Sequence, residues 1–365
     1  MRAVSLFSGA GGMDVGFKKA GFDIVAASEL DTHASSTFRE NHPGTILYEG
    51  DITENIEKLV SIKNVDVVFG GPPCQGFSVA GKMDSNDPRS KLIFSFADVI
   101  GALNPRVFVM ENVKALGELS KFAGVRRELM TRFIKSGYTV NMHILNAKDF
   151  GVPQSRERVF FIGVKSKIKP VSSQQFKKYI LKPPSLREAI GHLGPAGCPT
   201  NNRVCNAKIT LASKPILRKS PYAGMMFNGQ GRPLNPDGWA STLPASMGGN
   251  RTPIVDERHL YNNSPSWVEN YHLHLMKGGK PYNMNEVPGY LRRLTVDEAA
   301  LLQGFPADYK FMGPQSRVFS QIGNAVPCKL AHVVASVIRQ LFEEKSDGQQ
   351  HDYSKGENLE LSFAN

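Results

Sequence analysis

The chain has 365 residues, 41% hydrophobic and 21% charged, which is the balance of a globular protein large enough for one big or two ordinary domains. Its formal net charge is +11, and it contains no run of 18 apolar residues, which argues against a membrane-spanning segment. The N-terminus opens as a strand-like segment without the plan of a signal peptide, so we expect a cytoplasmic protein. The cysteines form no C-x-x-C pair, and their spacing therefore indicates neither a disulfide framework nor a metal site; they are Cys74, Cys198, Cys205 and Cys328.

The first 165 residues alternate short apolar runs with amphipathic segments. The apolar runs, which we expect to be strands, are residues 4–7, 24–27, 45–48, 65–69, 107–110, 140–145 and 159–164. Helix candidates include residues 12–20, 92–103 and 126–135. Strands that alternate with helices predict an α/β fold with a parallel, doubly wound sheet.

After Lys165 the chain becomes rich in Pro, Gly, Ser, Asn and basic residues, which predicts a second, smaller, loop-rich domain over 166–315. Regular patterning returns at 294–303, where Thr295 and Glu298 match a helix-starting capping box. A last helix is expected from about Pro327 to Glu343, with an apolar stripe formed by Leu330, Val333, Val334, Val337, Ile338 and Leu341. Beyond it, residues 344–365 are polar and without pattern, so we expect a disordered tail there.

The excess positive charge is concentrated in the second domain. Residues 166–290 contain sixteen Lys and Arg against six Asp and Glu. Lys and Arg provide most of the non-specific affinity of proteins for nucleic acids, so the segment predicts a polyanionic partner. A basic surface that serves only solubility is the alternative.

A rigid loop follows the strand expected at 65–69. The loop, residues 70–78, reads Gly-Gly-Pro-Pro-Cys-Gln-Gly-Phe-Ser and carries Cys74 to the carboxyl end of the strand, where ligands of open α/β sheets bind. The two prolines restrict the backbone, and the two glycines that begin the loop permit close approach. Cys74 is therefore a candidate nucleophile, the alternative being a small buried cysteine in a turn.

Acidic residues follow the earlier strands. Residues 7–14 form a Gly-rich turn that opens a helix, but Asp14 stands where the dinucleotide fingerprint requires its third glycine, which disfavours a pyrophosphate. Glu29 is placed to bind a ribose diol, and Asp51 could accept from an adenine amino group beside Ile52. Together these residues predict an adenosine group without phosphates, a description that fits S-adenosyl-L-methionine. Capping or surface charges are the alternative.

Taken in order, these blocks resemble the DNA (cytosine-5)-methyltransferases of the bacterial restriction–modification type. The resemblance covers about residues 1–165 and 290–330 and implies a Rossmann-like S-adenosylmethionine-dependent methyltransferase fold in the bacterial cytoplasm. In this family the segment after 165 is a target-recognition domain, and 316–343 returns to the catalytic domain, 1–165. The matching blocks are 7–12, Glu29, Asp51, 71–75, 87–89, 111–113, 154–158, 293–295, 303–306 and 321–327.

The resemblance also implies a mechanism. Cytosine C5 is a poor nucleophile, and attack by the Cys74 thiolate at C6 makes it able to accept a methyl group. Glu111 is implied to contact N3 and the exocyclic amine as the acid, which requires a raised pKa. Arg156 and Arg158 are expected to alternate on one strand, facing the same way, and to hold the base and the nucleophile loop. Cys328 is expected to be a packed core thiol.

Further residues are assigned to the cofactor and to DNA. The cofactor set is Phe7, Gly9, Gly11, Gly12, Glu29, Asp51, Ile52, Pro73, Leu92, Asn324 and Ala325. Because both faces of the target base must be reached, the cytosine has to leave the duplex, and the second domain is expected to hold the DNA. The DNA set is Gln75, Ser78, Thr242, Leu243 and Arg251, the last because Arg is the usual reader of guanine.

We therefore predict a methyltransferase that acts on cytosine in a short specific duplex sequence and works as a monomer. A restriction endonuclease for the same site, not in complex with the chain, is left open, as is the target sequence. The alternatives are a tRNA cytosine-5 methyltransferase, which the large basic domain disfavours, and a DNA-binding regulator with a dead site. A nicotinamide oxidoreductase is disfavoured by Asp14.

Overall fold

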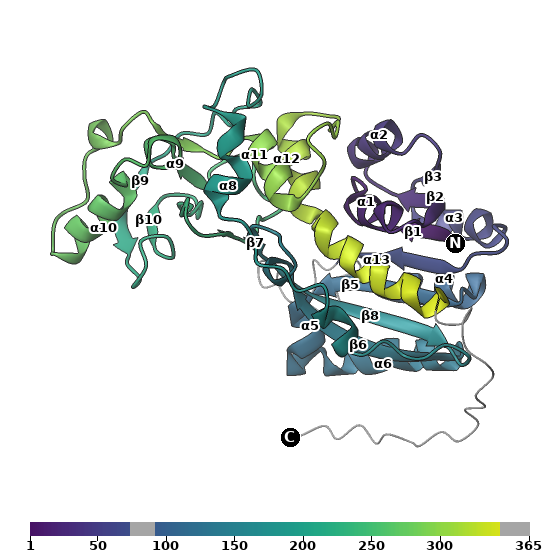
Figure 1. The fold of residues 1–365 in the computed structure, drawn as a ribbon. Coiled ribbons are helices and arrows are strands. Elements are labelled where there is room, and N and C mark those ends of the chain that lie inside the picture. Colours follow the sequence, from purple (N-terminus) through teal and green to yellow (C-terminus); the bar gives the residue numbers. More distant parts are fainter. Residues whose placement is uncertain (74–91, 344–365) are drawn as a thin grey trace.

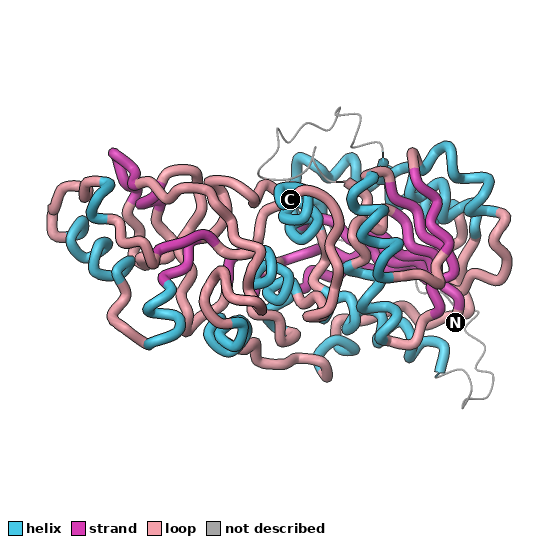
Figure 2. The backbone as a smooth tube through the Cα atoms, turned by 90° about the horizontal axis from the view of Figure 1, so that it is seen from above, coloured by secondary structure: helices cyan, strands magenta, loops and turns pink. Residues whose placement is uncertain are grey.

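The computed structural model describes residues 1–73 and 92–343 of the chain. Three predicted site residues, Cys74, Gln75 and Ser78, lie outside the described residues, as does the tail predicted at 344–365. Figure 1 shows a layered α/β part joined to an extension of short strands, short helices and long loops, and Figure 2 shows the same two parts from above.

A seven-stranded sheet forms the middle layer of the first part, in the order β3-β2-β1-β4-β5-β8-β6. Its central strands are buried on both faces, which explains why their sequences are continuous apolar runs. The strands are β1 (Arg2–Leu6), β2 (Asp23–Glu29), β3 (Ile46–Glu49), β4 (Val67–Gly70), β5 (Val107–Val113), β6 (Tyr138–Asn146) and β8 (Glu157–Lys165). The predicted α/β, doubly wound fold class is confirmed.

The orientation of β8 differs from the prediction. β3, β2, β1, β4 and β5 pair in parallel, but β8 runs antiparallel to both β5 and β6. The expectation of an all-parallel sheet is therefore wrong at this edge. Only residues 147–156 join β6 to β8, whereas a parallel connection needs a crossover of about a dozen residues or more.

Helices cover both faces of the sheet (Figure 1). Residues of α1 (Gly12–Lys19) and α13 (Cys328–Glu343) share one hydrophobic core with the sheet, and residues of α3 (Ile52–Val60), α4 (Leu92–Leu103) and α6 (Ala123–Lys135) share another with its opposite face. The remaining helical elements of this part are α2 (Thr32–Asn41), α5 (Lys114–Glu118), η2 (Ser120–Phe122) and η3 (Ala147–Asp149).

The last helix, α13, packs against the first part of the molecule. A Cβ atom on Gly16 in α1 would lie 2.5 Å from the backbone nitrogen of His332, so α1 and α13 touch at their backbones. The predicted apolar stripe of α13 is buried in the core that it shares with α1. By length and composition the helical stretch Gln315–Glu343 could cross a membrane. However, 61% of its most apolar 18-residue segment is buried in the fold, and a buried core helix can have the same length and composition.

The second part is held together by two further cores. Its elements are α8 (Leu186–Ile190), η4 (Gly191–Leu193), β9 (Leu211–Ile216), β10 (Met225–Phe227), β11 (Ala240–Ser241), β12 (Ile254–Asp256), α9 (Glu257–Asn262), α10 (Trp267–Met276), η5 (Met284–Glu286), β13 (Leu291–Arg293), α11 (Val296–Gln303) and α12 (Gln315–Asn324). The short helix α7 (Gln174–Lys177) belongs to the first part instead, because its Phe176 lies in the core of α1 and α13. The outer core joins β9 and β10 to α10, and the inner core joins α8 to α11 and α12. The predicted capping box of α11 is confirmed, with Thr295 and Glu298 bonded reciprocally.

Candidate active site

Glu111 and Arg158 form an ion pair at the carboxyl end of β5. Nε of Arg158 lies 2.9 Å from Oε1 of Glu111, and the two side chains are only 13% and 11% exposed. The antiparallel register of β5 and β8 places Arg158 opposite Val113, two residues along from Glu111. Because side chains two apart share a face of a strand, this register brings the two side chains onto the same face.

The chain that leads to Cys74 passes directly against Glu111. A Cβ atom on Gly71 would lie 2.8 Å from Oε2 of Glu111, so only glycine fits there without displacement. The side chain of Asn112 donates to the carbonyl of Pro72 at 3.1 Å and fixes the next residue of the same segment. Pro73 is the last described residue before Cys74. The structure thus places the entry to the predicted nucleophile loop beside the predicted acid.

The electrostatics of Glu111 favour its protonated form. Burial raises the pKa of the Glu111 carboxyl above its ordinary value, and the positive charges of Arg158 and Arg156 oppose this only in part. The carboxyl keeps its proton to higher pH than an exposed glutamate would. This direction is the one that a proton-donating carboxyl requires.

Arg156 ties three distant segments together. It is 2% exposed, and its guanidinium donates to the carbonyls of Leu243 at 3.0 Å and Gly323 at 2.8 Å. It lies between β7 (Gln154–Ser155) and β8 rather than within one strand with Arg158, which corrects the expected geometry. The break arises because β7 pairs with β11 of the second domain and not with the main sheet. Arg156 therefore anchors the second domain close to Glu111.

The Gly-rich turn after β1 has a left-handed backbone. Phe7, Gly9 and Gly11 have φ of 53°, 55° and 85°, and a φ of this sign in Phe7 is uncommon outside functional turns. The Glu29 carboxylate accepts from the backbone N–H of Gly9 at 2.6 Å and, through its other oxygen, from Leu30 and Asp31. Burial raises the pKa of Glu29 while these N–H groups lower it. Glu29 thus braces the turn in addition to its predicted cofactor contact.

Asp51 and its neighbours lie where the next strands end. The Asp51 carboxylate caps α3 by accepting from the backbone N–H and the hydroxyl of Thr53, at 2.8 and 2.7 Å, and these bonds lower its pKa. Ile52 is buried, and Leu92 packs partly buried against the same core. Their predicted cofactor contacts remain predictions, but all of these residues follow strands of one sheet edge.

The two predicted cofactor residues near the C-terminus, Asn324 and Ala325, lie in the segment that packs against the Gly-rich turn after β1. A Cβ atom on Gly12 would lie 2.9 Å from Cβ of Ala325 and 2.8 Å from the carbonyl oxygen of Val326. Asn324, the last residue of α12, is exposed. The structure therefore brings 324–325 to the turn that the first strand ends in, across more than 300 residues of chain.

The predicted DNA residues fall into different environments. Thr242 is exposed and donates to the carbonyl of Ser155 at 3.0 Å, and Arg251 is exposed near Ser246. Leu243 is only 1% exposed, and its backbone bonds to Gln154 and Arg156. Its side chain is thus part of the inner core of the second part and does not face solvent, which corrects its place in the DNA set.

Three buried residues outside the predicted site set take part in this framework. The side chain of Gln154 donates to that of Gln303 at 2.6 Å and accepts from the backbone N–H of Leu243, and so links the end of α11 to the segment of Leu243. His42 and Tyr309 contact the Ala10–Gly11 turn from two distant segments. Gln154 belongs to the family-like block 154–158 and could have been singled out, whereas no local sequence pattern identifies the other two.

Comparison with known proteins gives one family. The family model of the C-5 cytosine-specific DNA methylases matches residues 1–340 of the chain. The chain is 33% identical to the type II methyltransferase M.NgoPII of Neisseria gonorrhoeae, over 94% of this chain and 96% of that protein. It is 34% identical to the type II methyltransferase M.MthTI of Methanothermobacter thermautotrophicus, over 94% and 98% of the two chains.

Solved structures agree on the fold. The S. pombe Dnmt2 methyltransferase superposes with a TM-score of 0.67 at 21% identity and covers 94% of this chain and 99% of its own. A putative DNA modification methyltransferase from an E. coli prophage gives a TM-score of 0.67 at 24% identity, with 94% and 99% coverage. At these identities the likeness establishes the fold and nothing more specific.

Proposed function

The chain belongs to the family of C-5 cytosine-specific DNA methylases, and from this premise we propose that it transfers the methyl group of S-adenosyl-L-methionine to C5 of a flipped-out cytosine in a short specific duplex sequence. The family as a whole uses this methyl donor. The observation that carries the proposal is the buried Glu111–Arg158 pair beside Gly71, at the entry to the loop that bears Cys74.

The residues at the edge of the sheet fit the proposed cofactor. The position that a Cβ atom would take on Gly9 has no neighbouring heavy atom within 4 Å, so open space lies over the turn. Glu29 and Asp51 offer carboxylates at the ends of two successive strands, suited to a ribose diol and an amino group. The bound cofactor would supply an electrophilic methyl group, and these side chains would bind and orient it.

The chain's own residues would perform the remaining steps. The Cys74 thiolate bonds to C6 of the cytosine while Glu111 donates its proton to N3, so that the ring does not accumulate negative charge. C5 then takes the methyl group, and its hydrogen leaves as a proton to solvent. The bond from C6 to sulfur breaks to restore the thiolate, and N3 returns its proton to Glu111 as the product base is released. Arg158 holds the Glu111 carboxyl in place for the donation.

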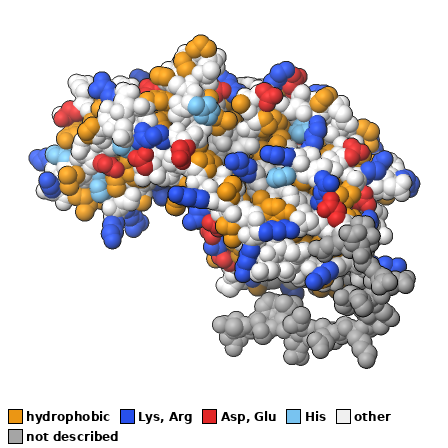
Figure 3. Space-filling view, viewed as in Figure 1, with side chains coloured by type: hydrophobic (Ala, Val, Ile, Leu, Met, Phe, Trp, Pro, Cys, Tyr) orange, Lys and Arg blue, Asp and Glu red, His pale blue; other side chains and the backbone are white. Residues whose placement is uncertain are grey.

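The second domain would hold the DNA. Figure 3 shows Lys and Arg side chains over the second part of the molecule and a hollow where the two parts meet. Because the relatives M.NgoPII and M.MthTI carry the name type II methyltransferase, we propose that this chain is also the modification enzyme of a restriction–modification system. It would act in the bacterial cytoplasm as a monomer, without forming a complex with a cognate endonuclease.

A covalent trap tests the mechanism. Duplex DNA with 5-fluorocytosine at the target should form an adduct in the presence of S-adenosylmethionine, because fluorine cannot leave as a cation once the methyl group is delivered. Cys74→Ser should abolish adduct and turnover, since an alcohol is almost wholly protonated at neutral pH. Glu111→Gln should slow turnover strongly but leave slow adduct formation.

Mass spectrometry of the trapped adduct identifies the residue that carries it. A peptide containing Cys74 supports the proposal. A peptide containing Cys198, Cys205 or Cys328 would overturn it, as would near wild-type methylation by Cys74→Ser. Cys328 is 4% exposed, and burial raises its thiol pKa far above the ordinary value, so it is a poor nucleophile.

A further inference from the structure

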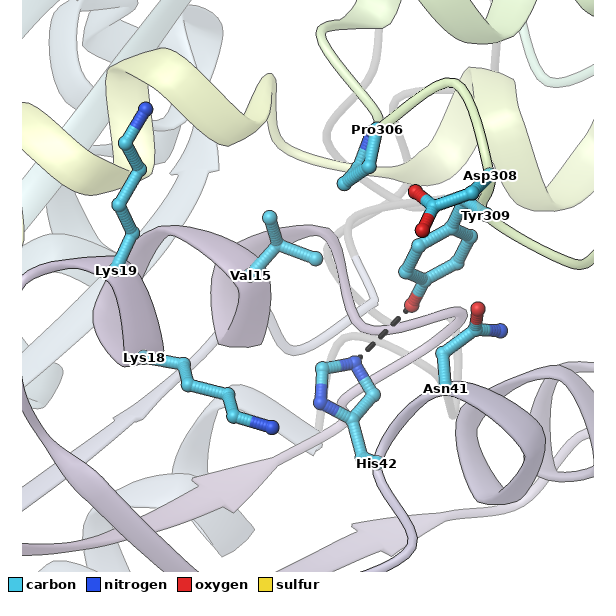
Figure 4. Close-up of a pocket in the computed structure, with 8 residues that line it drawn as sticks. All are labelled: Val15, Lys18, Lys19, Asn41, His42, Pro306, Asp308 and Tyr309. Atoms are coloured by element: carbon cyan, nitrogen blue, oxygen red, sulfur yellow. Dashed lines mark hydrogen bonds between the residues drawn. The ribbon is translucent and has the colours of Figure 1, made fainter.

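Two side chains from outside β1 and α1, those of His42 and Tyr309, contact the Ala10–Gly11 turn that joins these elements. The hydroxyl of Tyr309 donates a hydrogen bond to the carbonyl of Ala10, and Nε2 of His42 lies 3.1 Å from the same hydroxyl. Figure 4 shows the ring of His42 and the hydroxyl of Tyr309 pointing toward one another. His42 directly follows α2, and Tyr309 lies in the connection between α11 and α12.

The protons in this relay can be assigned. Burial raises the pKa of Tyr309 well above its ordinary value, so its hydroxyl keeps its single proton, which is donated to Ala10. His42 must then be the donor to Tyr309, with its proton on Nε2. Burial, and secondly the charge of Lys18, lower the pKa of His42 to about 4, so its ring is neutral at physiological pH. The order is therefore His42 to Tyr309 to Ala10.

The same two side chains determine which residue the turn can carry. Gly11 has a φ of 85°, and a Cβ atom there would lie 2.5 Å from Nε2 of His42 and 2.7 Å from the hydroxyl of Tyr309. Ala10 is 2% exposed. The side chains of His42 and Tyr309 thus lie directly against the backbone of the turn, so a shift of either ring would move the turn.

Tyr309 is itself fixed by aromatic packing. Its ring centroid lies 4.8 Å from that of Phe305 and 5.3 Å from that of Phe311. Phe305 also approaches the first residue of α1, because a Cβ atom on Gly12 would lie 3.5 Å from its ring. The C-terminal segment therefore forms a rigid support under the turn.

The support does not itself belong to the predicted cofactor site. A surface pocket of about 370 Å³ opens beside the pair, and its other lining residues are Val15, Lys18, Lys19, Asn41, Pro306 and Asp308. None of these is among the residues predicted to bind the cofactor. His42 and Tyr309 consequently act on the turn from outside the site.

We propose that His42 and Tyr309 are positioning residues for S-adenosylmethionine: they hold the Ala10–Gly11 turn, with its left-handed Gly11, in the conformation that receives the cofactor. The proposal rests on the proposed function, because it assumes that this turn contacts the cofactor. Since neither side chain touches the reacting atoms, they affect cofactor affinity and not the rate of the chemical step.

The test is a comparison of Tyr309→Phe with Tyr138→Phe in the full-length enzyme. Tyr138 is also a buried tyrosine whose hydroxyl donates to a backbone carbonyl, that of Pro105 at 2.7 Å, and it lies far from the turn. Both changes remove one hydroxyl and should lower thermal stability, Tyr309→Phe somewhat more because its hydroxyl also accepts from His42. Only Tyr309→Phe should weaken S-adenosylmethionine binding, by on the order of fivefold to tenfold, the factor that one or two hydrogen bonds contribute.

Substitutions of His42 provide a second, graded measurement. His42→Gln can place an amide N–H near the position of Nε2 and should keep most of the cofactor affinity, whereas His42→Leu should lose about the factor of one hydrogen bond. For Tyr309→Phe and His42→Leu, the KM for S-adenosylmethionine should rise while kcat at saturating cofactor and the Kd for DNA stay near the wild-type values. For His42→Gln and Tyr138→Phe, the KM should stay close to that of the wild type.

Three results would overturn the proposal: equal cofactor affinity in Tyr309→Phe and Tyr138→Phe, a fall in kcat without a change in KM, or equal behaviour of His42→Gln and His42→Leu. These outcomes differ from a failure of the proposed function, in which the wild-type protein itself would neither bind S-adenosylmethionine nor methylate DNA.

Discussion

The backbone at Gly71 lies directly against the Glu111 carboxylate, since a Cβ atom on Gly71 would be 2.8 Å from Oε2. The same carboxylate pairs with Arg158 through its other oxygen. Glu111 is therefore held on one side by a cation and on the other by the segment that carries the nucleophile. Its position depends on both neighbours.

Gly71→Ala should lower activity much more than stability. The added methyl group would displace the end of a side chain, which costs little folding free energy, but it would move the acid relative to the loop. A misplacement of about 1 Å can reduce the rate by about 100-fold. We expect kcat to fall by roughly that factor in a methyl-transfer assay, with only a small change in the melting temperature.

Gly124→Ala is the matched control, because no atom lies within 4 Å of the position that its Cβ would take in α6. It should leave kcat unchanged and leave stability unchanged or slightly higher. A Gly71→Ala enzyme with a wild-type kcat would show that the contact with Glu111 has no role in catalysis.

The pH dependence of activity should follow the protonation of the Glu111 carboxyl. A protonated carboxyl is needed, so kcat/KM should fall as pH rises through the raised pKa of Glu111. Arg158→Gln removes a positive charge that lowers this pKa, so its alkaline limb should move to higher pH even though its maximal activity is lower. Profiles of kcat/KM between about pH 5 and 9 measure this shift.

Lys114→Gln serves as the comparison for that profile. Lys114 is a cation on the next element, paired with Glu157 and Glu118, and it is not among the charges that act on Glu111. Its alkaline limb should coincide with that of the wild type. An alkaline limb that moves to lower pH in Arg158→Gln would contradict the assignment of Glu111 as the acid.

Asp14 should make the folded state less stable as pH rises. Its side chain is fully buried, and burial raises its pKa from 3.8 to about 7. Between these values the folded state binds a proton that the unfolded state has lost, so stability falls with rising pH and then levels off above about 7. The stability of Asp14→Asn relative to wild type should rise through this window by roughly 1.4 kcal/mol per pH unit.

Urea unfolding at pH 5, 6, 7 and 8 measures this difference. Asp51→Asn is the control of opposite sign: hydrogen bonds from Thr53 lower the pKa of Asp51, so its contribution is lost only in more acidic solution. Its difference from wild type should be constant over the same range. A constant difference for Asp14→Asn would mean that the carboxyl is not protonated in the folded state.

Binding to non-cognate duplex should depend steeply on salt. If the basic second domain contacts several phosphates, affinity should fall by orders of magnitude between about 50 and 200 mM salt, with a log–log slope of several units. Replacing the exposed cations Lys214, Arg218 and Lys219 by Gln should reduce the slope by about one unit for each phosphate that the variant no longer neutralises.

The matched triple variant replaces Lys19, Lys63 and Lys135, three exposed cations of the first domain. Its slope should equal that of the wild type when binding is measured by titration at several salt concentrations. A flat salt response of the wild type, or an equal reduction of the slope in both triple variants, would remove the argument that the second domain is the phosphate-binding part.

Much of the fold was predictable because local patterns report burial and helix ends. The apolar stripe of α13 and the Thr295–Glu298 capping box both appear in the structure as predicted. The antiparallel β8 was predicted wrongly, although the short connection 147–156 carried the necessary signal. Strand direction follows from the length of the connection and not from the composition of the strand itself.

The candidate site was predictable only as a set of residue types. Motifs pointed to Glu111 and both arginines, but they did not separate the two guanidinium groups. Arg158 pairs with the buried Glu111, and Arg156 donates to the carbonyls of Leu243 and Gly323. This division of roles depends on which segments pack around each arginine, and these segments come from all parts of the chain.

The sequence by itself determined the alternation of strands and helices, the Gly-rich turn, the placement of Cys74 after a buried strand and the basic character of the second domain. Each of these follows from interactions among residues a few positions apart or from composition. Only the tertiary structure decided that Glu111 is buried beside Gly71 and that His42 and Tyr309, 267 residues apart, meet beneath Ala10. Desolvation and long-range hydrogen bonds exist only after packing has excluded water, so no local pattern encodes them.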